Sequence, residues 1–481
     1  MKPEEAPLYA PVKVRMYEHQ NRAFAFGCNL FGLIEPPVKS RGFALLAEMG
    51  TGKSLVAIAL TGFINQVGYG GRAVIVAPLS MTGVWAEELE KFANFPYQVQ
   101  VLRGTMAQKR TQIETIPAGQ LQIIIVNYES AWRLEKELLA FAPHIVIADE
   151  AHKIKDGKSR QSKMLHKLGD VAHYKILLTG TVITNKEIDV FSQYRFLDPR
   201  IFGSSFYQFR GRYFEMGGYE HHVPIFRTYM RDEFLRKLHS IAFRVTKAEC
   251  LDMPETTDEI RTVDLEPKAM QIYKDIQKMS YAELENGEVT TLNVLSRLLR
   301  LSQITGGYLK DDDGNMHRVS EAKLKALSDI IDGAAAENKK LVVIARFKAE
   351  LDDIQTLLES KKLSYAVVRG GVQSRSEEVR RFQEDDDCKV FIGQIAAASL
   401  GLTLTAASTM VFYSLDYSYS NFDQAKARIH RVSQKENCQY IYLVARGTVD
   451  RKVLKTLHDK KDLAKMLVDD YRRGINPFEE E

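Results

Sequence analysis

The sequence predicts an α/β protein built from two doubly wound lobes, each with a parallel sheet. Three observations lead to this prediction. Short runs of Ile, Val and Leu without polar alternation recur in both halves, as expected for parallel strands covered by helices on both faces. Helical patterns lie between these runs. The chain has 481 residues, which is too long for a single hydrophobic core.

Each half of the chain contains five candidate strands. In the first half the apolar runs cover residues 42–47, 73–77, 123–126, 145–148 and 176–179. The second half repeats the pattern at residues 341–345, 365–368, 390–392, 410–413 and 440–444, with helical patterns at 348–360 and 376–382. We therefore expect one buried parallel sheet in each half.

The middle of the chain, from about residue 192 to residue 320, lacks this strand–helix rhythm. It is rich in aromatic residues and Arg, and it contains a long helical pattern at residues 292–304. We interpret it as mostly helical insertions between the lobes. The segment 311–315, Asp-Asp-Asp-Gly-Asn, predicts a turn or an exposed loop.

The composition is that of a water-soluble globular protein, with 45% apolar and 27% charged residues. No apolar run approaches the roughly 20 residues that cross a bilayer, and the first residues lack a signal-peptide core. The four cysteines are scattered, which predicts neither a disulfide framework nor a zinc site. The net charge of +4 is too small to identify a partner. We therefore expect the protein to reside in a reducing cytosol.

A phosphate-binding loop is predicted where the first apolar run turns through two glycines into a helix, at Gly50-Thr51-Gly52-Lys53-Ser54. The glycines allow backbone N–H groups to surround phosphate oxygens without a side-chain clash. Lys53 supplies a positive charge for the terminal phosphates, and Ser54 supplies a hydroxyl for Mg²⁺. The alternative is a chance glycine-rich turn, which the flanking strand and helix disfavour.

An acidic pair follows another apolar run, at Asp149-Glu150. Asp149 is placed to hold Mg²⁺, and Glu150 is placed to orient and deprotonate the attacking water. We expect His152 to relay the state of the site to Thr181 and its neighbours after the next strand. Together with the loop, the pair predicts an ATPase.

The order of these motifs resembles that of superfamily-two helicase motors, specifically the Swi/Snf-type DNA translocases, from about residue 14 to residue 450. The segment 17–20 is similar to the motif whose glutamine reads adenine, which implies that role for Gln20. Ala47 stands where the strict phosphate-loop pattern has Gly, as is normal in helicase-type ATPases. Further segments that resemble first-lobe motifs are residues 77–80 with 85–88, 127–129, 149–155 and 177–185.

The second half carries the strongest resemblance. Residues 399–407 match the family's fifth motif, and residues 424–434 match the sixth, with Ser433 in place of a Gly. The match implies nucleotide contacts for Gly401 and Gln424. It also implies that Arg428 and Arg431 reach the terminal phosphate as arginine fingers. Being three residues apart, they would share one face of a helix.

The resemblance implies two RecA-like lobes at residues 1–248 and 249–481, with helical protrusions at about 195–240 and 265–310. ATP and Mg²⁺ would bind in the cleft between the lobes, and their closing and opening would move a grip along a DNA strand. Backbone contacts of this kind are largely independent of sequence and sensitive to salt. The residues expected to contact DNA are Ser80, Asn127, Lys153, Lys155, Thr181, Arg346, Arg369, Gly370, Thr403 and Thr405.

Some of these features also have a structural interpretation. Lys153 and Lys155 begin a basic run with Lys158, Arg160 and Lys163. We expect this run to be a candidate contact for the DNA backbone, and the alternative is an ordinary solvated helix face. We interpret Trp85 and Trp132 as packing residues rather than base-stacking ones.

The sequence thus predicts an ATP-dependent translocase on double-stranded DNA, acting as a monomer in the cytoplasm of a bacterial or phage-infected cell, without a membrane partner. A strand-separating DNA or RNA helicase is the first alternative. A nucleic-acid-binding module that uses ATP as a switch is the second.

Overall fold

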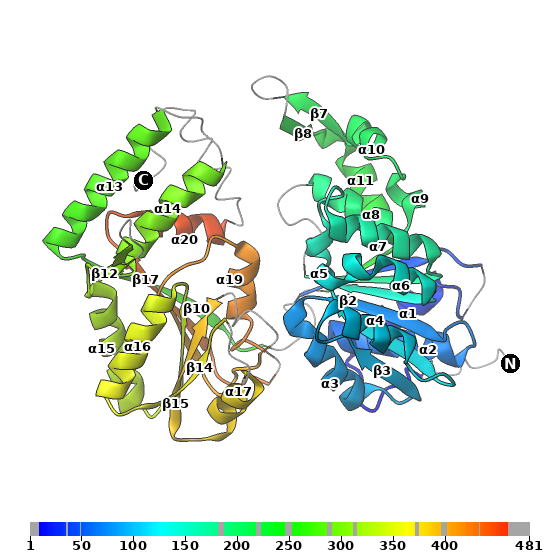
Figure 1. The fold of residues 1–481 in the computed structure, drawn as a ribbon, viewed down its shortest axis with the longest axis horizontal. Helices are drawn as coiled ribbons and strands as arrows, with labels where there is room; N and C mark the ends of the chain where they lie inside the picture. The colour runs from blue at the N-terminus through cyan, green and yellow to red at the C-terminus, as the bar shows by residue number, and fades with distance from the viewer. Residues whose placement is uncertain are drawn as a thin grey trace. The chain divides into compact units, whose positions relative to one another are not determined.

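The computed structural model describes residues 9–34, 37–48, 50–180, 187–217, 223–245, 253–285, 291–310, 315–370, 375–395, 402–431 and 433–459. The chain divides into two compact units, Met1–Leu251 and Asp252–Glu481 (Figure 1). The predicted domain boundary at residue 248 lies outside the described residues and stays a prediction. Among the described residues, no helix is both long and apolar enough to cross a membrane.

The first unit is built on a seven-stranded sheet in which all neighbouring strands are parallel. All five strands predicted for this half are present. In spatial order the strands are β3 (Tyr97–Val101), β4 (Leu121–Asn127), β2 (Arg72–Ala77), β5 (Ile145–Asp149), β6 (Tyr174–Thr179), β1 (Gly42–Ala47) and β9 (Ala242–Val245).

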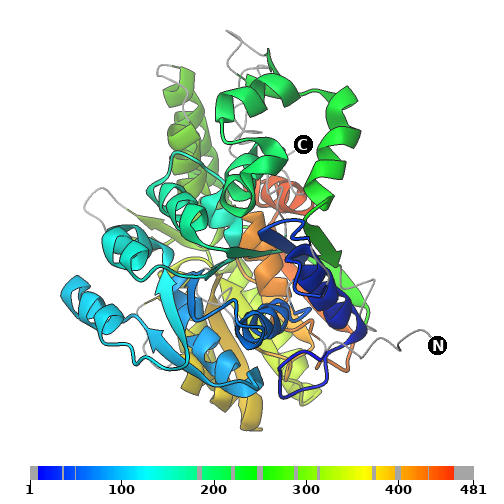
Figure 2. The same cartoon turned by 90° about the vertical axis from the view of Figure 1, so that its right-hand side faces the viewer.

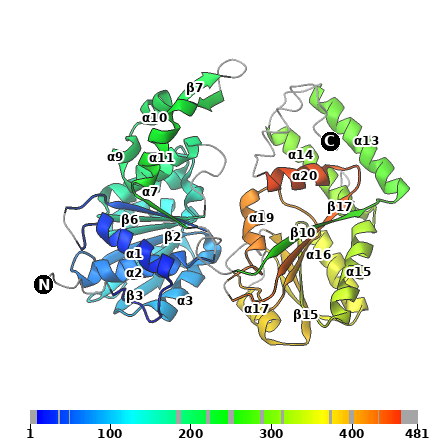
Figure 3. The same cartoon turned by 180° about the vertical axis from the view of Figure 1, so that it is seen from behind.

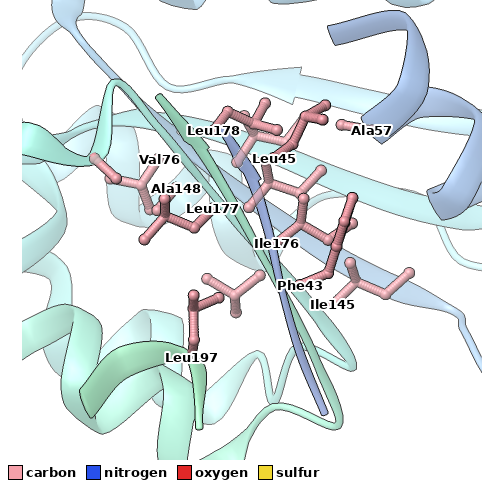
Figure 4. Packing of buried hydrophobic residues seen from close by; sticks show 14 of the residues in the cluster. Phe43, Leu45, Ala57, Val76, Ile145, Ala148, Ile176, Leu177, Leu178 and Leu197 are labelled. Carbon is pink, nitrogen blue, oxygen red and sulfur yellow. The ribbon is translucent and has the colours of Figure 1, made fainter. Parts of the chain in front are cut away.

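Helices cover this sheet on both faces, so the central strands are buried throughout. Ala57 of α2 lies on one side of β1 and β6, and Leu197 of α8 lies on the other (Figure 4). The helices α1 and α2 lie side by side (Figure 2). The helices of the first unit before its insertion are α1 (Glu18–Leu30), α2 (Lys53–Gln66), α3 (Thr82–Phe92), α4 (Met106–Glu114), α5 (Tyr128–Ala131), α6 (Glu135–Ala140), α7 (Arg160–Val171) and α8 (Val190–Leu197).

The second unit repeats this design with a six-stranded parallel sheet. Its strand order is β10 (Thr256–Val263), β17 (Cys438–Ala445), β16 (Thr409–Phe412), β13 (Leu341–Ala345), β15 (Cys388–Gln394) and β14 (Ser364–Val368). The predicted fold class, with two doubly wound parallel-sheet lobes, is therefore confirmed.

Two layers of helices cover this second sheet. The helices α15 (Ala322–Ala336) and α16 (Lys348–Ser360) lie side by side and pack on one face (Figure 3). The other face is covered by α17 (Arg375–Glu384), α19 (Tyr419–Lys426), α20 (Val449–His458) and α14 (Thr291–Thr305).

The middle region forms two insertions, and each contains an antiparallel strand pair as well as helices. The first comprises α9 (Pro199–Phe202), α10 (Phe206–Tyr213), β7 (Phe214–Gly217), β8 (Val223–Phe226) and α11 (Arg231–His239). The second comprises α13 (Pro267–Glu285), α14, β11 (Tyr308–Lys310) and β12 (Met316–Arg318). The predicted turn at 311–315 lies, except for Asn315, outside the described residues.

The aromatic residues of the first insertion form its own small core. Phe202 packs edge-on against Phe209 and Tyr213, with ring centroids 5.5 and 5.8 Å apart, and Phe234 joins them at 5.2 Å from Phe202. Such pairs add specific geometry to apolar burial. The aromatic composition of this region is therefore explained by packing.

A buried ion pair links α15 to α20. Nζ of Lys323 lies 2.6 Å from Oδ2 of Asp450, and only 2% and 10% of these side chains are exposed. Thr305 donates to the same carboxylate at 2.8 Å. We expect Lys323→Met to lower the free energy of unfolding of this unit by about 3–5 kcal/mol, because it leaves a buried carboxylate without its cation.

Urea denaturation followed by circular dichroism measures this loss. The control is Lys325→Met on the same helix, whose side chain is 68% exposed and pairs with Glu321 at 3.6 Å. A solvated pair of this kind contributes about 1 kcal/mol or less. Equal losses for the two variants would show that burial of the Lys323 pair does not matter.

Candidate nucleotide and nucleic-acid sites

The predicted phosphate loop lies between β1 and α2. Gly50 and Gly52 have φ angles of 85° and 84°, which residues with a Cβ rarely adopt. Lys53 is the first residue of α2, so the loop's N–H groups lie at a helix N-terminus, where anions are stabilised. The Lys53 ammonium donates to the Ala47 carbonyl at 2.9 Å.

The N-terminal helix α1 supports this loop. Nε2 of Gln20 donates to the Thr51 carbonyl at 3.0 Å, and Oε1 of Gln20 accepts from the Tyr17 N–H at 2.9 Å. Nε2 of His19 lies 3.0 Å from the same Thr51 carbonyl. Gln20, the predicted adenine reader, is therefore buried against the loop. Its side chain connects the loop to the start of α1.

Asp149 ends β5 and is held in place by aromatic side chains. Oδ2 accepts from the Trp85 indole N–H at 2.9 Å, and Oδ1 accepts from the Glu150 N–H at 2.9 Å. The Tyr128 hydroxyl donates to the Asp149 carbonyl at 2.7 Å. The carboxylate therefore keeps one orientation at the end of its strand.

The pKa of Asp149 is raised to about 7, first because burial disfavours its charged form and second because the charge of Glu150 lies beside it. The hydrogen bond from Trp85 and the charge of Lys53 oppose this shift. A nearby cation therefore favours the carboxylate form, as expected of a group that holds Mg²⁺.

Glu150 adopts a left-handed backbone conformation, with φ 49° and ψ 53°. Such a conformation is costly for a residue with a side chain, and strain of this kind is concentrated at functional sites. Oε2 of Glu150 lies 3.3 Å from Nδ1 of His152. The predicted relay residue His152 thus contacts the predicted base directly.

The register of the parallel strands brings the loop and the acidic pair to the same side of the sheet, at the carboxyl ends of the strands. Leu46 of β1 is opposite Thr179 of β6, and Asp149 of β5 is opposite Leu178 of β6. The donor set fits a magnesium nucleotide: the loop amides, Lys53, the partly exposed Ser54 and the carboxylate of Asp149. Mg²⁺ usually takes one or two protein ligands and completes its shell with phosphate and water.

In the second unit, the predicted helix carrying Arg428 and Arg431 is wrong. The helix α19 ends at Lys426, and residues 427–431 form turns and bends that bond to residues 402–404 of the fifth motif. The Leu404 N–H donates to the Arg428 carbonyl at 3.0 Å. Arg431 donates to Oγ1 of Thr403 at 2.7 Å.

The two arginines differ in exposure. Arg428 is fully buried and donates to the Leu402 carbonyl at 3.3 Å, whereas Arg431 is partly exposed. Gln424 lies on α19, also partly exposed, and Gly401 lies outside the described residues. The structure thus brings the fifth and sixth motifs together within their own unit.

The first-unit candidates for DNA contact follow three neighbouring strands. Ser80 follows β2, Asn127 ends β4, and Lys153 and Lys155 follow β5. The hydroxyl of Ser80 is buried and has no hydrogen-bond partner within the described part of the chain. Lys153 is exposed, and Lys155 is partly buried. These candidates share one sheet edge; Thr181 lies outside the described residues.

The second-unit candidates lie at the corresponding edge of the other sheet. Arg346 follows β13, and its guanidinium lies 3.7 Å above the ring of Tyr417. Arg369 follows β14 and pairs with Asp352 at 2.7 Å, and the Gly370 N–H donates to Gln394 at 3.1 Å. Thr403 and Thr405 lie in the fifth motif, where Gln434 donates to the Thr405 carbonyl at 3.3 Å.

Three supporting aromatic residues were not assigned a role in the site from the sequence. Trp85 and Tyr128 hold Asp149, and Tyr417 lies under Arg346. Trp85 was interpreted as a packing residue, and it is indeed buried. The available signal was that a buried indole N–H needs an acceptor.

We expect Gly52→Ala to weaken ATP binding at least tenfold. A Cβ at this position would overlap Nε2 of Gln20 and break the bond that holds the Thr51 carbonyl. The control is Gly68→Ala, which has the same left-handed backbone, with φ 85°, but nothing within 4 Å of the added Cβ. Titration with a fluorescent ATP analogue compares the two variants, and equal affinities would contradict this account of the loop.

The family model for the SNF2-related domain matches residues 12–306, which is more than half of the chain. The chain belongs to the SNF2-related family. A second family model, for the helicase conserved C-terminal domain, matches residues 322–433 of this SNF2-related chain. The two matches extend over both units.

The SNF2-related chain is similar to proteins from several organisms. It is 27% identical over 445 residues to a SWI/SNF-related matrix-associated actin-dependent regulator of chromatin subfamily A-like protein 1 homolog of Caenorhabditis elegans, covering 88% of this chain and 59% of the relative. It is 25% identical over 538 residues to the DNA repair and recombination protein RDH54 of Saccharomyces cerevisiae, covering 95% of this chain and 56% of the relative.

Among solved structures, the Sulfolobus solfataricus SWI2/SNF2 ATPase core in complex with dsDNA is 22% identical, with a TM-score of 0.47 and 99% of each chain covered. The SNF2-related chain spans somewhat more than half the length of the two curated relatives described above.

Proposed function

We propose that this chain is an ATP-dependent translocase on double-stranded DNA. The observation that supports ATP hydrolysis most strongly is that the phosphate loop, Asp149 and Glu150 meet at the carboxyl ends of neighbouring parallel strands. Membership of the SNF2-related family supports the same activity. The yeast relative is a DNA repair and recombination protein, in agreement with a DNA substrate.

In this proposal each residue of the first unit has a defined task. Backbone N–H groups from Gly50 to Ser54 bind the phosphates, and Lys53 neutralises their charge. Ser54 and Asp149 hold Mg²⁺, which when bound supplies further charge neutralisation at the transferred phosphoryl group. Glu150 orients a water and accepts its proton.

The second unit contributes Arg431, which stabilises the negative charge that develops on the phosphoryl group. We assign the finger role to Arg431 rather than Arg428, because Arg428 is fully buried and Arg431 is partly exposed. The role of Arg428 is then to fix the turn by its bonds to Leu402 and Leu404.

Polar and basic groups at the two sheet edges support a backbone-directed interaction with DNA. Phosphate contacts of this kind carry little sequence information and weaken as salt is added. The expected monomeric state and the cytosolic location stay predictions.

Triplex displacement beside duplex unwinding tests the proposal. The translocase should displace a third strand from duplex DNA in the presence of ATP and should not separate the strands of a partial duplex. Unwinding without triplex displacement would support a helicase. ATP-dependent binding with neither triplex displacement nor unwinding would support an ATP-switched module. Either of these two results would overturn the proposal.

A further inference from the structure

Two arginines lie against one tryptophan at the surface of the first unit. The guanidinium carbons of Arg133 and Arg160 lie 5.1 and 4.7 Å from the ring centroid of Trp132. Trp132 begins the short 3-10 helix η2 (Trp132–Leu134), whereas Arg160 begins α7. We call these three residues the Trp132 platform. Cation–π contacts within about 6 Å are attractive and restrict where a guanidinium lies.

The two guanidiniums have their hydrogen-bonding capacity available. Both arginines are exposed, and within the described ranges neither side chain makes an ion pair or a hydrogen bond. A guanidinium carries five N–H donors in a planar fork that matches the oxygens of a phosphate or carboxylate. The platform therefore presents two oriented forks to an anion.

The acidic side chains of α6 and α7 are all paired with basic ones. The carboxylates of Glu135 and Glu137 on α6 are paired, with Lys167 and with Arg110 respectively. Lys136 of α6 and Lys163 of α7 are exposed and have no ion-pair partner among the described residues. Because α6 packs against α7, these lysines add to the charge around the platform (Figure 1).

The topology places the platform on the side of the sheet that carries the nucleotide site, at the carboxyl ends of the strands. Trp132 follows Asn127 at the end of β4 through α5, and Arg160 follows Asp149 at the end of β5. The strands β4, β2 and β5 are consecutive neighbours, and all are parallel. The platform thus extends the row of polar residues that includes Ser80, Asn127 and Lys153.

We propose that the Trp132 platform binds phosphates of the duplex DNA backbone and that Trp132 is its positioning residue. This inference rests on the proposed function. DNA fits better than an acidic protein partner, because the exposed Lys136 and Lys163 adjoin the platform and lysine is depleted at protein interfaces. The exposed large apolar residue on α7 is Val171, at the far end of that helix from Arg160.

The test measures the affinity for a 30-base-pair duplex by fluorescence anisotropy at salt concentrations from 50 to 200 mM. Each phosphate contact contributes about 0.9 to the slope of log affinity against log salt. Arg133→Gln with Arg160→Gln should therefore lower the slope by about 1.8. At 0.1 M salt this corresponds to about an eightfold loss of affinity for each arginine.

The matched control is Arg72→Gln. Arg72 also lies over an aromatic ring, at 5.9 Å from the centroid of Phe141, but it begins β2 at the opposite edge of the sheet. The control should leave the slope unchanged and keep the affinity within twofold of that of the unchanged chain. An equal loss in the control and in the double variant would mean that the platform is not a specific contact.

Trp132→Leu tests the positioning role without changing any charge. Trp132→Leu should lower DNA affinity about threefold in the otherwise unchanged chain. Trp132→Phe, which keeps an aromatic ring, should retain most of the affinity. In the background without Arg133 and Arg160, Trp132→Leu should have no further effect. An equal effect in both backgrounds would show that Trp132 acts only through packing and would overturn its assigned role.

An unchanged salt slope in the double arginine variant would overturn the inference, even if the unchanged chain binds DNA well. That result would leave the proposed function intact and direct attention to an acidic protein partner. Failure of the unchanged chain to bind duplex DNA would overturn the proposed function, and the inference with it.

Discussion

Replacing Glu150 with Gln is expected to stop ATP hydrolysis while ATP binding is retained. The amide has nearly the same shape as the carboxylate, but it cannot accept the proton of the attacking water. Loss of a general base typically costs about 10²- to 10⁴-fold in rate. Steady-state phosphate release measures turnover, and titration with a fluorescent ATP analogue measures binding.

The control for this substitution is Glu114→Gln, an exposed residue at the end of α4 that should leave both quantities unchanged. If the Glu150 variant kept more than a tenth of the original turnover, another group would have to be the base. If it also lost ATP affinity, the Glu150 side chain would contribute to ATP binding as well as to hydrolysis.

Arg431→Ala is expected to lower turnover by about two orders of magnitude or more, with ATP affinity nearly unchanged. An arginine that meets only the charge developing in the transition state lowers kcat when it is removed. The substitution also removes the hydrogen bond to Thr403. Parallel measurement of kcat and of the dissociation constant separates the two effects.

The control variant is Arg446→Ala in the same unit, whose side chain is 67% exposed and pairs with Asp264 on the surface. It should keep wild-type turnover. Near-normal turnover in the Arg431 variant would exclude the finger role, and the buried Arg428 would not replace it without rearrangement of its turn.

Three strands were missing from the sequence prediction, because that prediction depended on continuous apolar runs. β3, β9 and β10 lie at sheet edges. An edge strand is partly exposed, so it has no need of a continuous apolar run; Thr256–Val263 is largely polar, and Tyr97–Val101 alternates. Buried central strands such as Gly42–Ala47 and Leu341–Ala345 were predicted to the residue.

Local motifs predicted the phosphate loop, because its glycines and helix start follow from adjacent residues. The surroundings of Asp149 were harder to predict, since Trp85 and Tyr128 reach it from segments distant in sequence. The ends of helices were also difficult. Arg428 and Arg431 are three residues apart, as on one face of a helix, but this segment forms turns that bond to the fifth motif.

The most direct test of the central claim is steady-state ATP hydrolysis without nucleic acid and with single-stranded DNA, duplex DNA or RNA, using Glu150→Gln as the blank. The translocase account predicts that duplex DNA stimulates hydrolysis far more than the other additions. Preferential stimulation by single strands or RNA, or no stimulation by any nucleic acid, would contradict it.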